Sequence, residues 1–307
     1  ACFPDSVVGF NSNSKTSEYF MHYLFQYISY EIKRRASGST QDNINIDYLE
    51  NLQFRVPSVP QQQKILKLLL NIDKKIELNC KYANELKLTA KDIYNSWFIQ
   101  QNIPGKQYSD YKFADKNKIK IPSSWDECKI SCLIKNTIQG DWGKEEKASN
   151  NMIDVFCIRG TDMPIFRDGV VDNLPIRYIL SKHSNRKLSS GDFVVEISGT
   201  PGRSTYINKN LLERYNNRVI SSNFCQAFSF INPKYVYWFY LFWDYLFENG
   251  LIEKFAGKTT ISNLQFDILA DSIYIVKPEE DDICQFYDTV APLFEQIQAT
   301  PSFCFLL

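Results

Sequence analysis

The sequence predicts an α+β fold in which long helices accompany a domain of short strands. Three observations predict it. Short apolar runs separated by turn residues fill positions 123–278, a stretch without Pro or Gly runs from Gln61 to Phe98, and one segment occurs twice at an offset of 220 residues. Short strands with intervening turns and a single helix are typical of a twisted sheet or an open barrel.

The repeated segment reads GSTQDNINIDYLENLQFRVP at residues 38–57 and GKTTISNLQFDILADSIYIVKP at residues 257–278, so that Asp47 corresponds to Asp267. Each copy follows an aromatic amphipathic pattern, and we interpret the pair as a tandem duplication. A strand is expected around each Asp-x-Leu. By the same offset the first copy lacks an equivalent of residues 123–220 and the second stops early, so we expect that both ends of the chain are cut.

The stretch after the first copy has apolar residues in two rows spaced by seven, which predicts a long spacer helix over residues 58–100 with a narrow coiled-coil seam. Asn79 lies within this seam, where it either fixes the register of a helix pair or faces solvent. The predicted seam residues are Ile65, Leu69, Ile72, Ile76, Asn79, Ala83, Leu86, Ala90, Ile93 and Trp97.

The second copy begins the same pattern, and two such helices can pair. An antiparallel pair would place residues 283–298 beside residues 80–97. The seam of residues 65–76 would then lack a partner, and we expect a neighbouring chain or aggregation to cover it. The predicted seam residues of the second helix are Ile283, Tyr287, Val290, Phe294 and Ile297.

Composition divides the chain into five parts. Residues 101–122 are polar and contain Pro and Gly, which indicates a linker. The strand-rich domain contains the apolar runs MIDVFCIRG, GDFVVEISG, STYIN, RVISSNFCQAFSF and DSIYIVK, with one aromatic helix expected near residues 234–254. The predicted parts are residues 1–57, 58–100, 101–122, 123–278 and 279–307.

Composition also excludes several function classes. The chain has no run of about 18 apolar residues that could span a bilayer and no signal segment, so a soluble intracellular protein is expected. Eight scattered cysteines and two histidines lack zinc-site spacing, and we expect most cysteines to be reduced packing residues. No catalytic acid/base pair, nucleophile motif or phosphate-binding lysine loop is recognisable, so we expect no catalysis.

The net charge of zero gives no global footprint of nucleic-acid binding, but residues 182–218 carry a local net charge of +4. Arg203, in the turn SGTPGRS, is the best single candidate for a contact with a guanine edge or a phosphate. Alternatively, it stabilises its own turn.

Small donors on two loops suit contacts with the DNA backbone or with base edges, although capping of a helix or strand would explain them as well. They lie in the two copies of the repeated segment. The predicted DNA-binding residues are Arg203, Ser204, Thr200, Lys258, Thr259, Thr260, Arg186, Lys187, Ser39, Thr40 and Gln41.

Several motifs in this order resemble the specificity subunits of type I restriction-modification systems. VPSVPQQQKILKLLLNIDKKIELNCKYANELKLTAKDIYNSWF resembles the helix that follows a target-recognition domain in that family. IPSSW resembles the start of the next such domain, LSSGDFVVEISGTPGRSTYI its central strand and turn, and GKTTISNLQFDIL its closing loop. The resemblance covers the chain except its last nine residues.

The resemblance implies two target-recognition domains separated by paired helices. Residues 1–57 would be the C-terminal remnant of the first domain, residues 123–278 the second domain, and residues 279–307 the truncated start of a second spacer helix. The chain would be a non-catalytic subunit that reads half of a bipartite target in double-stranded DNA.

The resemblance also implies a multisubunit complex in a prokaryotic cytoplasm. Two modification subunits would dock on the helices and methylate adenine with S-adenosylmethionine, and restriction or motor subunits would use ATP and Mg²⁺. No cofactor and no membrane association are expected for this chain itself. Two alternatives are a coiled-coil adaptor that binds protein without DNA specificity and the recognition part of a fused restriction-methylation enzyme.

Overall fold

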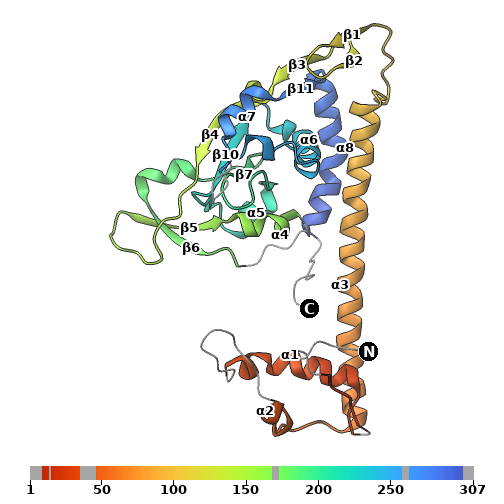
Figure 1. Cartoon of the computed structure of the whole chain (residues 1–307), viewed down its shortest axis with the longest axis vertical. Helices are drawn as coiled ribbons and strands as arrows, with labels where there is room; N and C mark the ends of the chain where they lie inside the picture. The colour runs from red at the N-terminus through yellow and green to blue at the C-terminus, as the bar shows by residue number, and fades with distance from the viewer. Residues whose placement is uncertain (1–8, 14, 35–45, 168–172, 258–262, 300–307) are drawn as a thin grey trace. The chain divides into compact units, whose positions relative to one another are not determined.

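The computed structural model, shown in Figure 1, divides the chain into two compact units, Ala1–Ile76 and Glu77–Leu307. The boundary falls within helix α3 (Val59–Tyr94). Among the helices in the described part of the chain, none is both long and apolar enough to cross a bilayer. The structure describes residues 9–13, 15–34, 46–167, 173–257 and 263–299.

The first unit consists of α1 (Glu18–Arg34), α2 (Ile46–Glu50) and the beginning of α3. Ser58 precedes α3, and both its backbone N–H and its hydroxyl donate hydrogen bonds to Gln61 Oε1, at 3.0 and 2.9 Å. A polar side chain that reaches back over the first turn in this way fixes the start of a helix.

A small core joins α1 to α3 within the first unit. Phe20 and Met21 of α1 are buried together with Leu66 of α3. Tyr23 donates a hydrogen bond to Asp73 across the same pair of helices. Leu66 and Asp73 of α3 therefore face α1, and both lie between the predicted seam positions rather than on them.

The second unit contains the rest of α3, a π-helical turn and an α+β domain. The π-helical turn is Asn95–Ile99. The strands are β1 (Tyr111–Ala114), β2 (Ile119–Pro122), β3 (Asp126–Lys129), β4 (Ile134–Gln139), β5 (Met152–Ile158), β6 (Ile176–Leu180), β7 (Phe193–Glu196), β8 (Ser204–Tyr206), β9 (Val219–Ser221), β10 (Cys225–Phe230) and β11 (Tyr274–Lys277). The α-helices are α4 (Met163–Arg167), α5 (Lys209–Arg214), α6 (Val236–Glu248), α7 (Phe266–Ser272) and α8 (Glu280–Ala299).

The strands of the second unit form small, mostly antiparallel sheets. The largest has the order β4-β10-β7-β8, and a second has the order β6-β5-β9, in which β9 runs parallel to β5. The remaining strands form the pairs β1-β2 and β11-β3. The described strands form small sheets and close no barrel, and the α+β prediction is confirmed.

Aromatic side chains fill the core between the largest sheet and α6. Phe193 of β7 and Phe228 of β10 meet Phe239 of α6 at ring-centre distances of 5.2 and 5.8 Å. On the other side of α6, Tyr237 stacks on Phe294 of α8 with ring centres 4.3 Å apart. The layers are therefore sheet, α6 and α8, as Figure 1 shows for the labelled elements.

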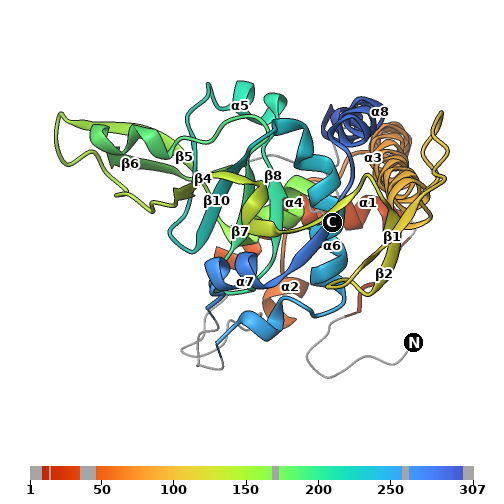
Figure 2. The same cartoon turned by 90° about the horizontal axis from the view of Figure 1, so that it is seen from above.

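Helix α8 lies antiparallel to the part of α3 that belongs to the second unit, and the two helices are side by side in Figures 1 and 2. Phe286, near the start of α8, lies 5.0 Å from Phe98 and 6.1 Å from Tyr94 in ring-centre distance. This is the antiparallel pairing of residues 283–298 with residues 80–97 that the two seams predict.

The order of elements repeats at the predicted offset. Helices α1, α2 and α3 of the first copy correspond to α6, α7 and α8 of the second. One detail of the prediction is wrong, because Asp47 lies in α2 and Asp267 in α7, so each Asp-x-Leu is helical rather than extended. The strand of the second copy begins later, at Tyr274.

Residues 101–122, predicted as a linker, contain the β1-β2 hairpin. Tyr111 pairs with Pro122 and Ala114 with Ile119. Only Ala114, Ile121 and Pro122 among the residues of the two strands are buried, so the apolar alternation that reveals a half-buried strand is weak here.

Candidate nucleic-acid interface

The turn between β7 and β8 carries the best single candidate from the sequence. Its backbone closes with hydrogen bonds from Gly202 N–H to the Glu196 carbonyl at 2.9 Å and from Arg203 N–H to the Thr200 carbonyl at 3.2 Å. Gly202 has a φ of +92°, which favours glycine, and its carbonyl accepts a hydrogen bond from Trp243 Nε1 at 2.8 Å. The turn is therefore fixed from inside the core.

Arg203 is engaged within the protein. Its Nη1 donates to the Gly160 carbonyl at 3.0 Å, and its Nη2 donates to Thr200 Oγ1 at 2.7 Å. Nη1 also lies 3.6 Å from Glu196 Oε2, and the side chain is 23% exposed. This geometry supports the alternative role, in which Arg203 stabilises its own turn.

The other candidates on this turn differ in exposure. Thr200 is exposed and stands at the outer part of the turn. Ser204 is a residue of β8 and is only 1% exposed, so its hydroxyl is not available at the surface, contrary to the prediction. A strand residue that points into the core cannot contact DNA without unfolding.

The second predicted loop begins and ends beside this turn. Asn263 forms a β-bridge with Ser198, and Leu264 N–H donates to the Ile197 carbonyl at 2.7 Å. Gly257 N–H donates to the Asn263 carbonyl at 3.0 Å, which closes the loop at its base. Residues that are distant in sequence thus meet at one edge of the domain. The candidates Lys258, Thr259, Thr260, Ser39, Thr40 and Gln41 lie outside the described residues.

Arg186 belongs to a separate cluster around Asp141. Asp141 Oδ2 lies 2.9 Å from both Arg186 Nη1 and His183 Nδ1, and Asp141 Oδ1 accepts from Gly143 N–H at 2.9 Å. Arg186 also donates to the Gly140 carbonyl at 3.2 Å. The aspartate therefore organises this turn, and it could not be found from the sequence because its nearer side-chain partner, His183, is 42 residues away.

The local positive charge of residues 182–218 is partly balanced by carboxylates outside that segment. Arg186 pairs with Asp141, and Arg218 pairs with Asp154. These two ion pairs reduce the local excess of positive charge that the sequence suggests. Lys182 is exposed and Lys187 is half-buried, and neither forms an ion pair with a described residue, so both are available to a phosphate.

The predicted seam of α3 is covered in one stretch and exposed in another. In the second unit Ala83, Leu86, Ala90 and Trp97 are buried and Ile93 packs against the same core. In the first unit Ile65 is 40% and Ile72 47% exposed. The half-buried seam residues of the helix are Leu69, Ile76 and Asn79.

The predicted seam of α8 is buried except at its edge. Tyr287 is half-buried and stacks on Tyr237 with ring centres 5.3 Å apart. Phe286, which the seven-residue spacing did not select, is fully buried against the end of α3. The wider apolar stripe of a globular helix, with positions i, i+3, i+4 and i+7 counted from Ile283, would have included it. The buried seam residues of α8 are Ile283, Val290, Phe294 and Ile297.

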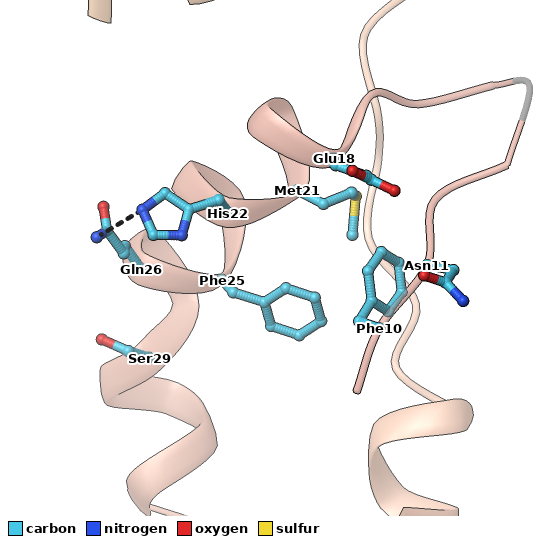
Figure 3. Close-up of a pocket in the computed structure, with 8 residues that line it drawn as sticks. All are labelled: Phe10, Asn11, Glu18, Met21, His22, Phe25, Gln26 and Ser29. Atoms are coloured by element: carbon cyan, nitrogen blue, oxygen red, sulfur yellow. Dashed lines mark hydrogen bonds between the residues drawn. The ribbon is translucent and has the colours of Figure 1, made fainter. Parts of the chain in front are cut away.

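The first unit has its own groove, which Figure 3 shows beside α1. Its volume is about 560 Å³, and Phe10, Met21 and Phe25 supply its apolar side. Phe10 and Phe25 meet edge to face with ring centres 5.5 Å apart, and Gln26 Nε2 lies 3.2 Å from His22 Nε2. No residue predicted for DNA contact lines this groove.

The described residues contain no group of His, Cys, Asp and Glu that could hold a metal ion. Cys128, Cys132, Cys157, Cys225 and Cys284 are free thiols. Burial raises the pKa of Cys128 to about 11 and the pKa values of Cys157 and Cys225 to about 12. These three are poor nucleophiles at neutral pH, as packing residues are expected to be.

Comparison with known proteins gives a family match in the first part of the chain and a sequence match over most of it. Residues 2–88 match the type I restriction modification DNA specificity domain. The type I restriction enzyme MjaIX specificity subunit from Methanocaldococcus jannaschii is 24% identical over 299 residues, covering 92% of this chain and 63% of that protein. The type I restriction enzyme HindI specificity subunit from Haemophilus influenzae is 29% identical over 87 residues, covering 28% of this chain and 17% of that protein.

Among solved structures, the type I restriction-modification system S subunit from M. genitalium is similar at 16% identity with a TM-score of 0.47, covering 92% of this chain and 67% of that protein. The chain spans less than two thirds of the length of each curated relative. Residues 2–88 therefore match the type I restriction modification DNA specificity domain, and most of the chain is similar in sequence to a type I restriction enzyme specificity subunit.

Proposed function

We propose that this chain is a non-catalytic subunit that recognises a DNA sequence within a type I restriction-modification complex. The match of residues 2–88 to a DNA specificity domain carries the proposal. Two curated relatives named as specificity subunits of type I restriction enzymes support it. The second unit, with its fixed turn and adjoining loop, would read one half of a bipartite target.

Geometry favours one edge of the second unit as the DNA-contacting surface. The exposed Thr200 and the base of the 257–263 loop lie together there, joined by the Ser198–Asn263 bridge. Thr200 and the loop would meet phosphates or base edges, Arg203 would hold the turn in place, and Lys182 and Lys187 would add phosphate contacts. Hydroxyl and backbone donors position a protein on DNA without a large net charge.

The helices would serve assembly. The pairing of α8 with α3 holds one end of α3 against the second unit, and the exposed seam residues Ile65 and Ile72 offer an apolar surface to a partner. Modification subunits would dock there. Any S-adenosylmethionine, ATP and Mg²⁺ would belong to partner subunits, and the complex would work in a prokaryotic cytoplasm.

A salt titration tests DNA recognition. A labelled duplex library is bound to the protein at several salt concentrations and the bound fraction is sequenced. Affinity that falls steeply with salt, together with enrichment of one sequence, is expected, because each phosphate contact releases counterions. Lys182→Ala with Lys187→Ala should reduce the salt slope by about one to two and leave the enriched sequence unchanged.

The second candidate is a protein-binding adaptor, which the exposed apolar residues of α3 and the zero net charge favour. It predicts salt-insensitive binding of a protein partner with no enriched DNA sequence. That outcome would reject DNA recognition by this chain. Enrichment in the library would reject the adaptor.

A further inference from the structure

A pocket opens beside the β7–β8 turn, where β4, β5, β7 and β9 end. Its volume is about 380 Å³. None of the described candidates for DNA contact lines it. The lining residues on which its chemistry depends are Trp142, Arg159, Gly160, Glu196, Gly199 and Phe224.

Glu196 is the recessed polar group of this pocket. The residue is 6% exposed, and its Oε2 accepts no hydrogen bond from the described part of the chain. Arg203 Nη1, at 3.6 Å, balances the charge but lies beyond hydrogen-bonding distance. Burial raises the pKa of Glu196, while the Thr200 N–H and the Arg203 charge lower it. A buried acceptor in this state can accept a hydrogen bond from a molecule that enters the pocket.

Two glycines make room for the Glu196 carboxylate. A Cβ atom on Gly160 would lie 2.1 Å from Glu196 Cδ, and one on Gly199 would lie 2.5 Å from Glu196 Oε1. Gly199 also has a φ of +110°. Any side chain at either position would push the carboxylate out of its place, so the local sequence holds an acidic group where burial alone would exclude it.

The walls of the pocket suit a flat, uncharged ligand. The Arg177 guanidinium lies 3.8 Å from the centre of the Trp142 ring and holds it by a cation–π contact. Phe224, 54% exposed, offers a second aromatic ring at the rim. A cationic ligand is disfavoured, because Arg159 lines the pocket and Arg203 already compensates Glu196.

We propose that this pocket takes an unstacked cytosine or adenine base of DNA, whose amino group at N4 or N6 donates to Glu196 Oε2 and whose ring stacks on the aromatic wall. The identification of DNA as the source rests on the proposed function. Cytosine N4 and adenine N6 present the donor that a carboxylate accepts, whereas thymine and guanine present carbonyl oxygens at the corresponding position. Stacking on an aromatic side chain stabilises an unstacked base by about 1–3 kcal/mol.

The test compares two single-stranded hexamers, oligodeoxycytidine and oligodeoxyuridine. The cytosine ring carries an amino group at C4, where the uracil ring carries a carbonyl oxygen. Trp142 reports binding, because the remaining tryptophans are at most 6% exposed. Quenching of tryptophan fluorescence is expected with the cytidine hexamer, and about tenfold weaker binding with the uridine hexamer. Trp142→Phe should remove the signal while anisotropy of a labelled hexamer still reports binding.

Two variants separate the two contacts. In the Glu196→Gln variant the side-chain amide both accepts and donates hydrogen bonds, so the ratio of the affinities for the cytidine and uridine hexamers should fall to near one. Circular dichroism should show that this variant stays folded. Phe224→Ala should weaken the binding of both hexamers to a similar degree. The matched control is Asp192→Asn, which removes another buried carboxylate whose partners are Ser189 N–H and Ser229 Oγ, both at 2.7 Å. It should keep the preference.

Equal binding of the two hexamers, no binding of either, or a preference that survives Glu196→Gln would overturn the proposal. The salt titration with duplex DNA is independent of these results. Sequence enrichment in the duplex library without a hexamer preference would leave DNA recognition standing and reject the base pocket. A hexamer preference without duplex enrichment would support the pocket and reject sequence recognition.

Discussion

Arg203 uses its guanidinium inside the β7–β8 turn, where it bridges the Gly160 carbonyl and the Thr200 hydroxyl. A planar guanidinium that donates in two directions fixes the spacing of the groups it joins. At the scale of single residues, this arginine stabilises the turn that carries it. Sequence inspection could identify the arginine and the turn but not the carbonyl 43 residues away.

Arg203→Ala is expected to lower the free energy of unfolding by about 1 kcal/mol, because two hydrogen bonds of a partly exposed cation are lost. Urea denaturation measures this. Arg203→Lys keeps the charge without the two-directional geometry, so it should resemble the alanine variant in stability and in DNA affinity. A lysine variant with reduced stability but wild-type DNA affinity would assign Arg203 to a phosphate contact instead.

Glu196 shows what a sequence leaves hidden. It closes the apolar run FVVE before a glycine-rich turn, where a strand-end glutamate is normally solvent-exposed. Its burial depends on Gly160, which lies in another segment and leaves space for the carboxylate. The sequence shows the strand, the turn and the glycines separately. That they lie together around Glu196 becomes clear only from the sheet topology.

At the scale of elements, the start of α8 depends on one lysine. Asp282, in the first turn of α8, is fully buried, and it forms an ion pair with Lys106 and accepts a hydrogen bond from Tyr108 OH at 3.1 Å. Lys106 also pairs with Glu279. Burial lowers the pKa of Lys106, but hydrogen bonds to Asp282 and Glu279 outweigh this and raise it.

Lys106→Met should lower the free energy of unfolding by about 3 kcal/mol, because Asp282 would be left buried without a cation. Urea denaturation again provides the measurement. Lys91→Met is the control, since Lys91 and Glu248 form an exposed pair at 3.1 Å and its loss should cost less than about 1 kcal/mol. Equal losses for the two variants would contradict the role of Lys106, whereas recovery in a Lys106→Met, Asp282→Asn double variant would support it.

The exposed seam of α3 should cause self-association of the protein. Replacing Ile72 and Ile76 with Glu is expected to reduce the apparent mass in light scattering at high concentration, because charges would interrupt the apolar stripe. Leu68→Glu with Leu78→Glu is the matched control, as both leucines are exposed but lie off the seam. A protein that is already monomeric, or oligomers that persist in the Ile variant, would reject the seam as a contact surface.

Elements with a buried apolar face could be predicted from sequence, and exposed ones could not. The apolar runs around β5, β7, β10 and β11 each contain the expected strand. The β1-β2 hairpin escaped because most of its residues are exposed and leave no alternation. Strand pairing was also inaccessible, since β10 between β4 and β7 joins segments that are far apart in the chain.

At the scale of the whole molecule, the repeat predicted the order of elements better than any local pattern. The offset aligns α1, α2 and α3 with α6, α7 and α8 although few residues are identical. α6 is largely buried between the sheet and α8, whereas α1 exposes Tyr19, Tyr27 and Tyr30. The corresponding helices α1 and α6 therefore have different surroundings in the two units. Aligning the residues of the two copies does not reveal this difference.

The antiparallel pair of β3 and β11 has an evolutionary consequence. Asp126 lies opposite Lys277, and Lys129 opposite Tyr274, so the chain enters and leaves the strand-rich domain at one point. The segment between Ile130 and Ile273 can therefore be exchanged as one block by recombination at these two strands. A lineage could therefore acquire a new strand-rich domain in a single event while it keeps α3 and α8, and shuffled descendants would differ abruptly between these two strands and hardly at all outside them.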